Sequence, residues 1–168
     1  MRRIKTRKKA NCLAVFILCL LNIGNTYEHE QAQMESVWGK EKSSIALIYI
    51  IEFRDILCSP CSESFLDFCL SLPPEFQREN TWGIVVFDPD SQTNLGDKII
   101  AKKVRGFMNG NQLHFPLFID FSHIFRTLRI QSTQLFLLDS TSLTIKKYIF
   151  PLSEKQKNEI VQSVLTSL

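Results

Sequence analysis

The stretch EFRDILCSPC, residues 52–61, decides how this chain can fold. Two cysteines, Cys58 and Cys61, enclose a Ser-Pro pair directly after the apolar run 44–53. Pro60 suits the first turn of a helix, because an N–H missing there loses no hydrogen bond. A helix N-terminus carries about half a positive charge, which favours an anion at that end. A C-x-x-C pair after a buried strand and before a helix is therefore typical of redox chemistry.

The two cysteines of this pair are expected to differ in exposure and in role. Cys58 would lie at the helix N-terminus with its sulfur exposed and its thiolate stabilised. Cys61, one turn later, would be more buried and would attack a mixed disulfide formed at Cys58. A structural bridge or an inactive remnant is the alternative, although so short a loop removes little chain entropy. The sequence has no second C-x-x-C to complete a zinc site, so we predict no metal and no cofactor beyond the redox-active disulfide itself.

The first 26 residues differ in composition from the rest of the chain. Six basic residues and no acid occupy the first ten positions, and an apolar segment follows. This is the form of a secretory signal, and the segment is short for a simple membrane span of about 20 residues. We expect a signal peptide or signal anchor over 1–26, with 11–24 as the tether, a linker over 27–43 and one domain over 44–168. The positive-inside bias places that domain outside the cytoplasm, in the periplasm or cell envelope.

The charge of the chain argues against a nucleic-acid partner. The formal net charge is +3, but without the six basic residues of the leader the balance is 14 basic against 17 acidic residues, or −3. The basic pI of 8.6 therefore reflects the leader and not a nucleic-acid surface. With 45% hydrophobic residues, thirteen of them Phe, the 168 residues can build one domain whose core needs no disulfides.

The hydrophobic pattern predicts an α/β fold in the order β-α-β-α-β-α-β-β-α. Buried apolar runs predict strands, amphipathic spacing predicts the helices between them, and an alternating pair predicts a hairpin. Ser153 opens the last helix, with Gln156 completing a capping box, and the helical spacing predicts an inner face made of Ile160, Val161, Val164 and Leu168. Such alternation implies a mostly parallel sheet between helices, with an antiparallel hairpin at one end. The predicted strands are 44–53, 81–90, 115–120, 133–139 and 143–150, and the helices between them include 94–109 and 122–130.

Phe53, Cys58, Pro60 and Cys61 form a pattern, F-x-x-x-x-C-x-P-C, that resembles the active-site segment of thioredoxin-like proteins. The resemblance covers about residues 44–167 in element order. The additional helix and strand at 94–120 resemble the insertion of the redoxin branch, which contains TlpA-like thiol-disulfide reductases and, more distantly, the AhpC-TSA-like peroxiredoxins. It implies a thioredoxin-like three-layer sandwich with a mixed central sheet. It also implies that Glu52, six residues before the first cysteine, is a buried acid that relays a proton to the second cysteine.

The sequence departs from the thioredoxin pattern at two places near the cysteines. Leu57 stands where an aromatic residue usually precedes the first cysteine, and Thr133 or Gln134 replaces the cis-proline of the family. We expect a trans peptide there, because a cis bond before a non-proline residue costs about 3 kcal/mol. By resemblance, substrate contacts would come from both sides of the site, namely from Ser59, Pro60, Ser132, Thr133 and Gln134.

These features predict an exported thiol-disulfide oxidoreductase that exchanges disulfides with protein thiols and receives electrons from an upstream reductant. A non-catalytic binding module of the same fold is the first alternative. A thiol peroxidase is the second, but Asp55 stands where the peroxidatic motif has Thr, and Arg126 and Arg129 are only loosely placed partners. Cys69 is expected to be a core thiol, with a resolving cysteine as the alternative. Copper-delivery relatives of this fold use two cysteines and a distant histidine, for which His123 is the nearest candidate, but they separate their cysteines by three residues and not by two, which argues against a copper site here.

Overall fold

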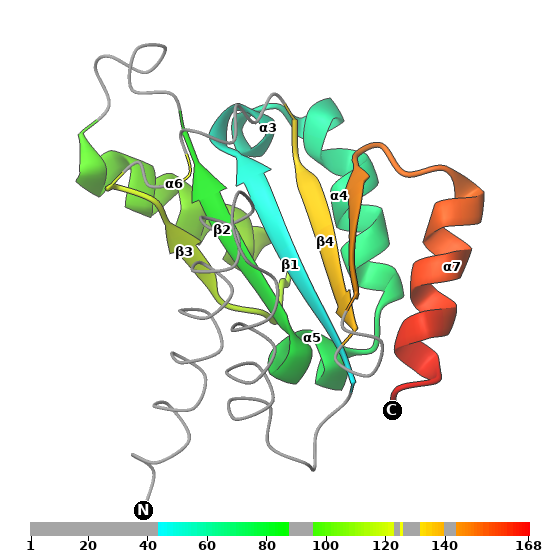
Figure 1. The fold of residues 1–168 in the computed structure, drawn as a ribbon. Helices are drawn as coiled ribbons and strands as arrows, with labels where there is room; N and C mark the ends of the chain where they lie inside the picture. Colours follow the sequence, from blue (N-terminus) through cyan, green and yellow to red (C-terminus); the bar gives the residue numbers. More distant parts are fainter. Residues whose placement is uncertain (1–43, 88–95, 123–124, 126–131, 140–143) are drawn as a thin grey trace, which may run out of the picture.

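The computed structural model describes residues 44–87, 96–122, 125, 132–139 and 144–168. A five-stranded sheet with the order β3-β2-β1-β4-β5 forms its centre (Figure 1). The pairs β1–β2 and β2–β3 are parallel, and the pairs β1–β4 and β4–β5 are antiparallel, which confirms the mixed sheet and the hairpin at one edge. The strands are β1 (Ile45–Glu52), β2 (Thr81–Val86), β3 (Leu117–Ile119), β4 (Gln134–Asp139) and β5 (Thr144–Ile149).

The central strand, β1, is apolar throughout because both of its faces are covered. All eight of its residues are buried. Tyr49 and Ile51 face the larger hydrophobic core, whereas Ile48 and Ile50 face a second, smaller one. Alternate residues of a strand point to opposite faces, so a run that is polar at every second position would leave one core incomplete.

The helices described in the structure pack their apolar sides into the larger core, on one face of the sheet (Figure 1). They are α3 (Phe53–Leu57), α4 (Ser59–Ser71), α5 (Pro74–Asn80), α6 (Asp97–Gly110) and α7 (Glu154–Leu165). The opposite face carries the smaller core, to which Phe125 contributes. Phe125 belongs to the segment predicted as the helix 122–130, most of which lies outside the described residues, as do the leader and linker at 1–43.

Two short helices were missed by the sequence analysis. The first, α3 (Phe53–Leu57), follows β1 directly and buries Phe53 and Ile56, which lie three residues apart on one helical face. The second, α5, begins at Pro74, the second residue of the Pro73-Pro74 pair, and α4 ends at Ser71, two residues before that pair. Gln77 holds α5 against the end of α4. The side-chain amide of Gln77 donates to the carbonyl oxygens of Cys69 at 2.7 Å and Leu72 at 3.1 Å.

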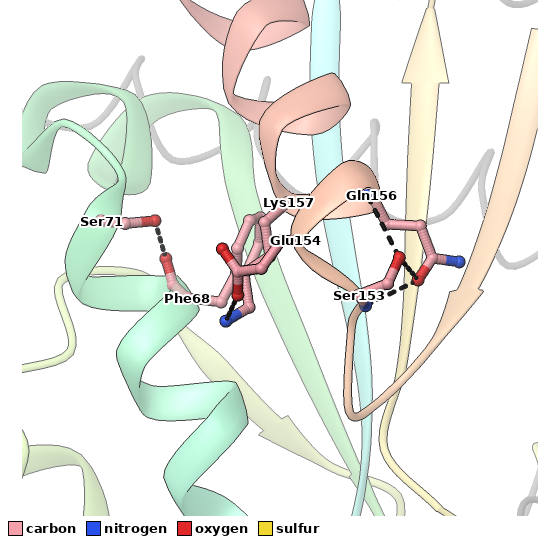
Figure 2. A network of polar contacts seen from close by, with 6 residues as sticks. All are labelled: Phe68, Ser71, Ser153, Glu154, Gln156 and Lys157. Carbon is pink, nitrogen blue, oxygen red and sulfur yellow. Dashed lines mark hydrogen bonds and ion pairs between the residues drawn. The ribbon is translucent and has the colours of Figure 1, made fainter.

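The last helix, α7, begins with the predicted capping box (Figure 2). The Gln156 N–H donates to Ser153 Oγ at 3.3 Å, and the Ser153 N–H donates to Gln156 Oε1 at 2.9 Å. Figure 2 also shows the ion pair between Lys157 and Glu154, 2.7 Å long, in the first turn. These contacts satisfy N–H groups that have no partner within the helix and fix where α7 starts.

The inner face of α7 differs from the prediction at its end. Ile160 and Val164 are completely buried, as expected. Leu168, which the periodicity placed on the same face, is 68% exposed, because α7 ends at Leu165. Glu159 ties the helix to the edge strand β5 by accepting from Lys146 Nζ at 2.8 Å.

Candidate functional site

The cysteine pair lies at the junction of two helices, α3 and α4. Cys58 and Cys61 form a disulfide, and their Cα atoms are 5.2 Å apart. The Cys58 N–H donates to the Asp55 carbonyl oxygen at 3.3 Å, and the Cys58 carbonyl oxygen accepts from the N–H groups of Cys61 at 3.0 Å and Ser62 at 3.1 Å. Cys58 is therefore held as the N-cap residue of α4, where the helix dipole favours a thiolate.

The exposure of the two cysteines is the reverse of the prediction. Cys61 is exposed and Cys58 is half-buried, so the expectation that Cys61 is the more buried residue is wrong. The reason is the orientation of α4, whose buried face includes Ser62 and Phe65. Cys61 precedes Ser62 by one residue, a rotation of about 100° around the helix, and is turned outward. Ser59, Pro60 and Leu57 are exposed as well, so the disulfide lies at the surface of the protein.

Glu52 is a buried acid at the carboxyl end of β1. Its exposed fraction is 3%, and its Oε1 accepts from the exposed Arg54 guanidinium at 3.0 Å. Its Oε2 is buried without a hydrogen-bond partner among the described residues. Burial raises the pKa of Glu52, while the hydrogen bond and charge of Arg54 act in the opposite direction. A carboxyl that holds its proton to a higher pH than usual is suited to proton transfer.

Thr133 is one of the two residues, with Gln134, that were predicted to replace the cis-proline, and its N–H, its carbonyl oxygen and its hydroxyl all form hydrogen bonds within the protein. Its N–H and its Oγ1 donate to Asp55 Oδ2, at 3.0 Å and 2.8 Å, and its carbonyl oxygen accepts from the Phe150 N–H at 3.0 Å. Among the described residues the only cis peptide bond is Phe150–Pro151, so the bonds on both sides of Thr133 are trans, as predicted. Figure 1 shows α3 and the start of β4 at the same end of the sheet.

The five residues predicted to contact substrate differ in access. Ser59 and Pro60 are exposed, and Ser132 is half-buried. Thr133 and Gln134 have exposed fractions of only 3% and 6%, and Gln134 begins β4 opposite Ile50 of β1. The exposed surface at the disulfide is thus formed by the first turn of α4, whereas Thr133 and Gln134 are buried.

Asp55 is the residue of this site whose contact the sequence analysis did not predict. It entered that analysis only as a departure from the peroxidatic motif. Its carboxylate nevertheless makes two hydrogen bonds to Thr133, a residue 78 positions later. The one local signal was an acid a single turn before Cys58, and its partner could not be identified without the fold.

Cys69 is the one further cysteine among the described residues, and it belongs to the hydrophobic core. Cys69 is a free, fully buried thiol whose pKa is raised by burial, which confirms the prediction of a core residue. In the described ranges there is no group of three or more His, Cys, Asp or Glu residues arranged to hold a metal ion. His123, Arg126 and Arg129 lie outside those ranges.

A membrane span would need a long apolar helix. None of the helices described here has the length and composition to cross a bilayer. The predicted tether, 11–24, is not among the described residues.

Comparison with solved structures agrees with the fold described above. No family profile matches the chain, and no curated protein matches its sequence. A protein assigned as a thioredoxin from Neisseria meningitidis is 12% identical, with a TM-score of 0.50 over 74% of this chain and 77% of that one. StoA from Bacillus subtilis is 17% identical, with a TM-score of 0.42 over 74% of this chain and 84% of its own. A protein assigned as the thiol:disulfide interchange protein DsbE from Chlorobium tepidum is 15% identical, with a TM-score of 0.47 over 75% and 81%. The chain thus has the thioredoxin-like fold, with a C-x-x-C disulfide after its first strand.

Proposed function

We propose that this protein is an extracytoplasmic thiol-disulfide oxidoreductase that exchanges disulfides with protein partners. One observation carries the proposal, namely the surface disulfide Cys58–Cys61 at the N-terminus of α4 in a thioredoxin-like fold. A bridge that closes so short a loop contributes little to folding, and the apolar core is extensive without it. Reversible exchange is the chemistry for which such a pair is suited.

The reaction proceeds by two thiolate attacks. In the reduced protein, the Cys58 thiolate attacks one sulfur of a partner disulfide, the partner's S–S bond breaks, and a mixed disulfide forms as the other partner sulfur leaves as a thiolate. Cys61 then loses its proton and attacks the Cys58 sulfur. The Cys58–Cys61 bond forms, the second partner thiolate is released, and two electrons have passed to the partner. An upstream dithiol protein reduces the pair again by the reverse steps.

Glu52 is the proposed acceptor of the Cys61 proton. Its carboxyl is buried, has an Oε2 without a hydrogen-bond partner among the described residues, and has a raised pKa. A base with a pKa nearer the working pH transfers protons in both directions more efficiently than an exposed carboxylate does.

The order of the two attacks is tested by trapping. Because Cys58 caps α4, its thiolate is stabilised and it attacks first; the greater exposure of Cys61 would favour the opposite order. The Cys61→Ser variant should accumulate mixed disulfides with partners, and the Cys58→Ser variant should not. Trapping only in Cys58→Ser would reverse the assignment. No trapping in either variant, together with a reduction potential below about −300 mV, would indicate an inert structural bridge.

The second candidate function is a non-catalytic binding module of the same fold. The observation in its favour is Thr133, which is buried and whose N–H and carbonyl groups are both engaged within the protein, so neither is free to pair with a partner's backbone. Such a module would bind its partner equally well whether the Cys58–Cys61 pair is intact or replaced by two serines. Loss of partner binding or exchange in the double serine variant would exclude it.

Export is proposed from the basic and apolar leader alone. A reporter enzyme that is active only outside the cytoplasm, fused after Leu168, should be active with the full chain and inactive when residues 1–26 are removed. Extraction of membranes with alkaline carbonate then separates a retained anchor from a cleaved signal.

A further inference from the structure

We propose that Asp55 is a positioning residue for the cysteine pair, which it holds in place through Thr133. This role rests on the proposed exchange function and adds to it a residue that does not itself react. Asp55 lies in α3, one turn before Cys58, and it is half-buried.

Asp55 connects the cysteine segment to β4 through both of its polar groups. Its main-chain carbonyl oxygen accepts from the Cys58 N–H at 3.3 Å. Its carboxylate Oδ2 accepts from the N–H and the hydroxyl of Thr133, at 3.0 Å and 2.8 Å. A single residue thereby spans the distance between the N-cap of α4 and the segment before β4.

Thr133 is a firm anchor for this connection. Its carbonyl oxygen accepts from the Phe150 N–H at 3.0 Å, and its exposed fraction is 3%. The residue after it, Gln134, is already paired with β1. Movement of the Asp55 carboxylate would therefore require a buried and fully hydrogen-bonded residue to move with it. Hydrogen bonds to an ionised carboxylate are about twice as strong as neutral ones, which makes the contact a stiff one.

The consequence concerns the reactivity of the disulfide. An intramolecular disulfide forms readily when its two sulfurs are held close in the correct orientation, and loosening that geometry lowers the effective concentration of one thiol at the other. We call the two hydrogen bonds from Thr133 to the Asp55 carboxylate the Asp55–Thr133 clamp. The clamp restrains the segment before Cys58, so it raises the effective concentration of Cys61 at Cys58.

The experiment measures the equilibrium of the full chain with glutathione, which reports that effective concentration directly. Thr133→Val removes the hydroxyl donor without changing charge, and Thr133→Ser restores it. Asp55→Asn removes the charged acceptor, and Asp67→Asn is the matched control because it removes the same charge from an exposed position on α4. We expect the equilibrium constant to fall about tenfold in Thr133→Val and in Asp55→Asn, and to stay at the wild-type value in Thr133→Ser and Asp67→Asn.

The double variant distinguishes the clamp from two separate effects. If the two side chains act as one unit, Asp55→Asn with Thr133→Val should lower the constant no further than either single change. A wild-type constant in both single variants, with only the thermal stability reduced, would overturn the proposal and leave the clamp a purely structural contact. Failure of both single variants to fold would overturn it in the same way. A wild-type protein that forms no mixed disulfides with protein partners would instead contradict the exchange function, because the glutathione equilibrium needs only the cysteine pair.

Discussion

The carboxylate of Asp55 accepts hydrogen bonds from both the N–H and the hydroxyl of Thr133, and the two residues are 78 positions apart in the chain. Thr133 is one of the two residues, with Gln134, that the sequence places where thioredoxin-like proteins have a cis-proline, and here it is hydrogen-bonded to the segment that leads to Cys58. A proline has no N–H and no hydroxyl, so it could not make either of these hydrogen bonds. The contact between the cysteine segment and the start of β4 is thus built from a different pair of residues.

The first prediction concerns the stability that the Asp55–Thr133 clamp contributes. Thr133→Val should lower the free energy of unfolding by about 1–3 kcal/mol, because it removes a hydrogen bond to a charged group and leaves the Asp55 carboxylate with one donor fewer. Urea denaturation of the oxidised protein measures this change. Thr133→Ser should recover most of the loss, and an equal loss in Ser and Val variants would show that packing of the Thr133 methyl group is responsible.

The second prediction concerns the pH dependence that Glu52 introduces. Its pKa is raised in the folded protein, chiefly by burial. The folded state therefore binds the Glu52 proton more strongly than the unfolded state does. The stability gained from this proton is fully present below the pKa of the unfolded chain, about 4.3, and is lost as the pH rises through the pKa of the folded state. Glu52→Gln cannot ionise, so its stability relative to the wild type should increase over that window.

The pKa of Glu159 shifts in the opposite direction from that of Glu52, so the pH dependence of its contribution to stability is also opposite. Its pKa is lowered by the hydrogen bonds from Lys146 and Tyr148. The contribution of the ionised Glu159 to the stability of the fold is present above the pKa of the unfolded chain and is lost as the pH falls through the pKa of the folded state. The difference in stability between the wild type and Glu159→Gln should therefore shrink toward acid. The same slope for Glu52→Gln and Glu159→Gln would contradict the assignment for Glu52.

The third prediction separates Cys69 from the redox chemistry. Cys69 is completely buried in the larger core, and burial raises its pKa, so its thiolate is disfavoured. Cys69→Ala should lower the free energy of unfolding by about 1 kcal/mol through the cavity it leaves, and it should not change the glutathione equilibrium of the Cys58–Cys61 pair. Denaturation and the glutathione titration test the two parts. Peroxide consumption that requires Cys69 would instead make it a resolving cysteine.

The fourth prediction concerns the packing of β2 against β3. A methyl group on Gly83 would overlap the Leu117 side chain and lie 3.2 Å from the Phe115 ring. Gly83→Ala should therefore destabilise the protein by about 1–3 kcal/mol through overpacking. Gly106 in α6 is the matched control, since a methyl group there meets no atom within 4 Å. Gly106→Ala should stabilise the protein by up to about 1 kcal/mol, because alanine favours a helix. Urea denaturation compares the two variants, and equal effects would refute the packing argument.

Local chemistry was sufficient to predict much of this fold. The apolar run of β1, the alternating hairpin and the capping box at Ser153 each depend on neighbours in the chain, so their patterns can be read directly. The helices α3 and α5 were missed for a related reason. Both are short, and their stability comes from Phe53 and Phe76, which are fully buried against distant parts of the core.

The sequence by itself determined the cysteine pair and its place after a buried strand and before a helix, because the apolar run, Pro60 and the spacing of the cysteines are all local features of the chain. The buried acid at the end of that strand was implied only by the resemblance to thioredoxin-like proteins. Only the tertiary structure decided that Cys61 faces outward and that Asp55 binds Thr133. The first depends on how α4 is rotated by the burial of Ser62 and Phe65, and the second on a sheet that brings together segments far apart in the chain.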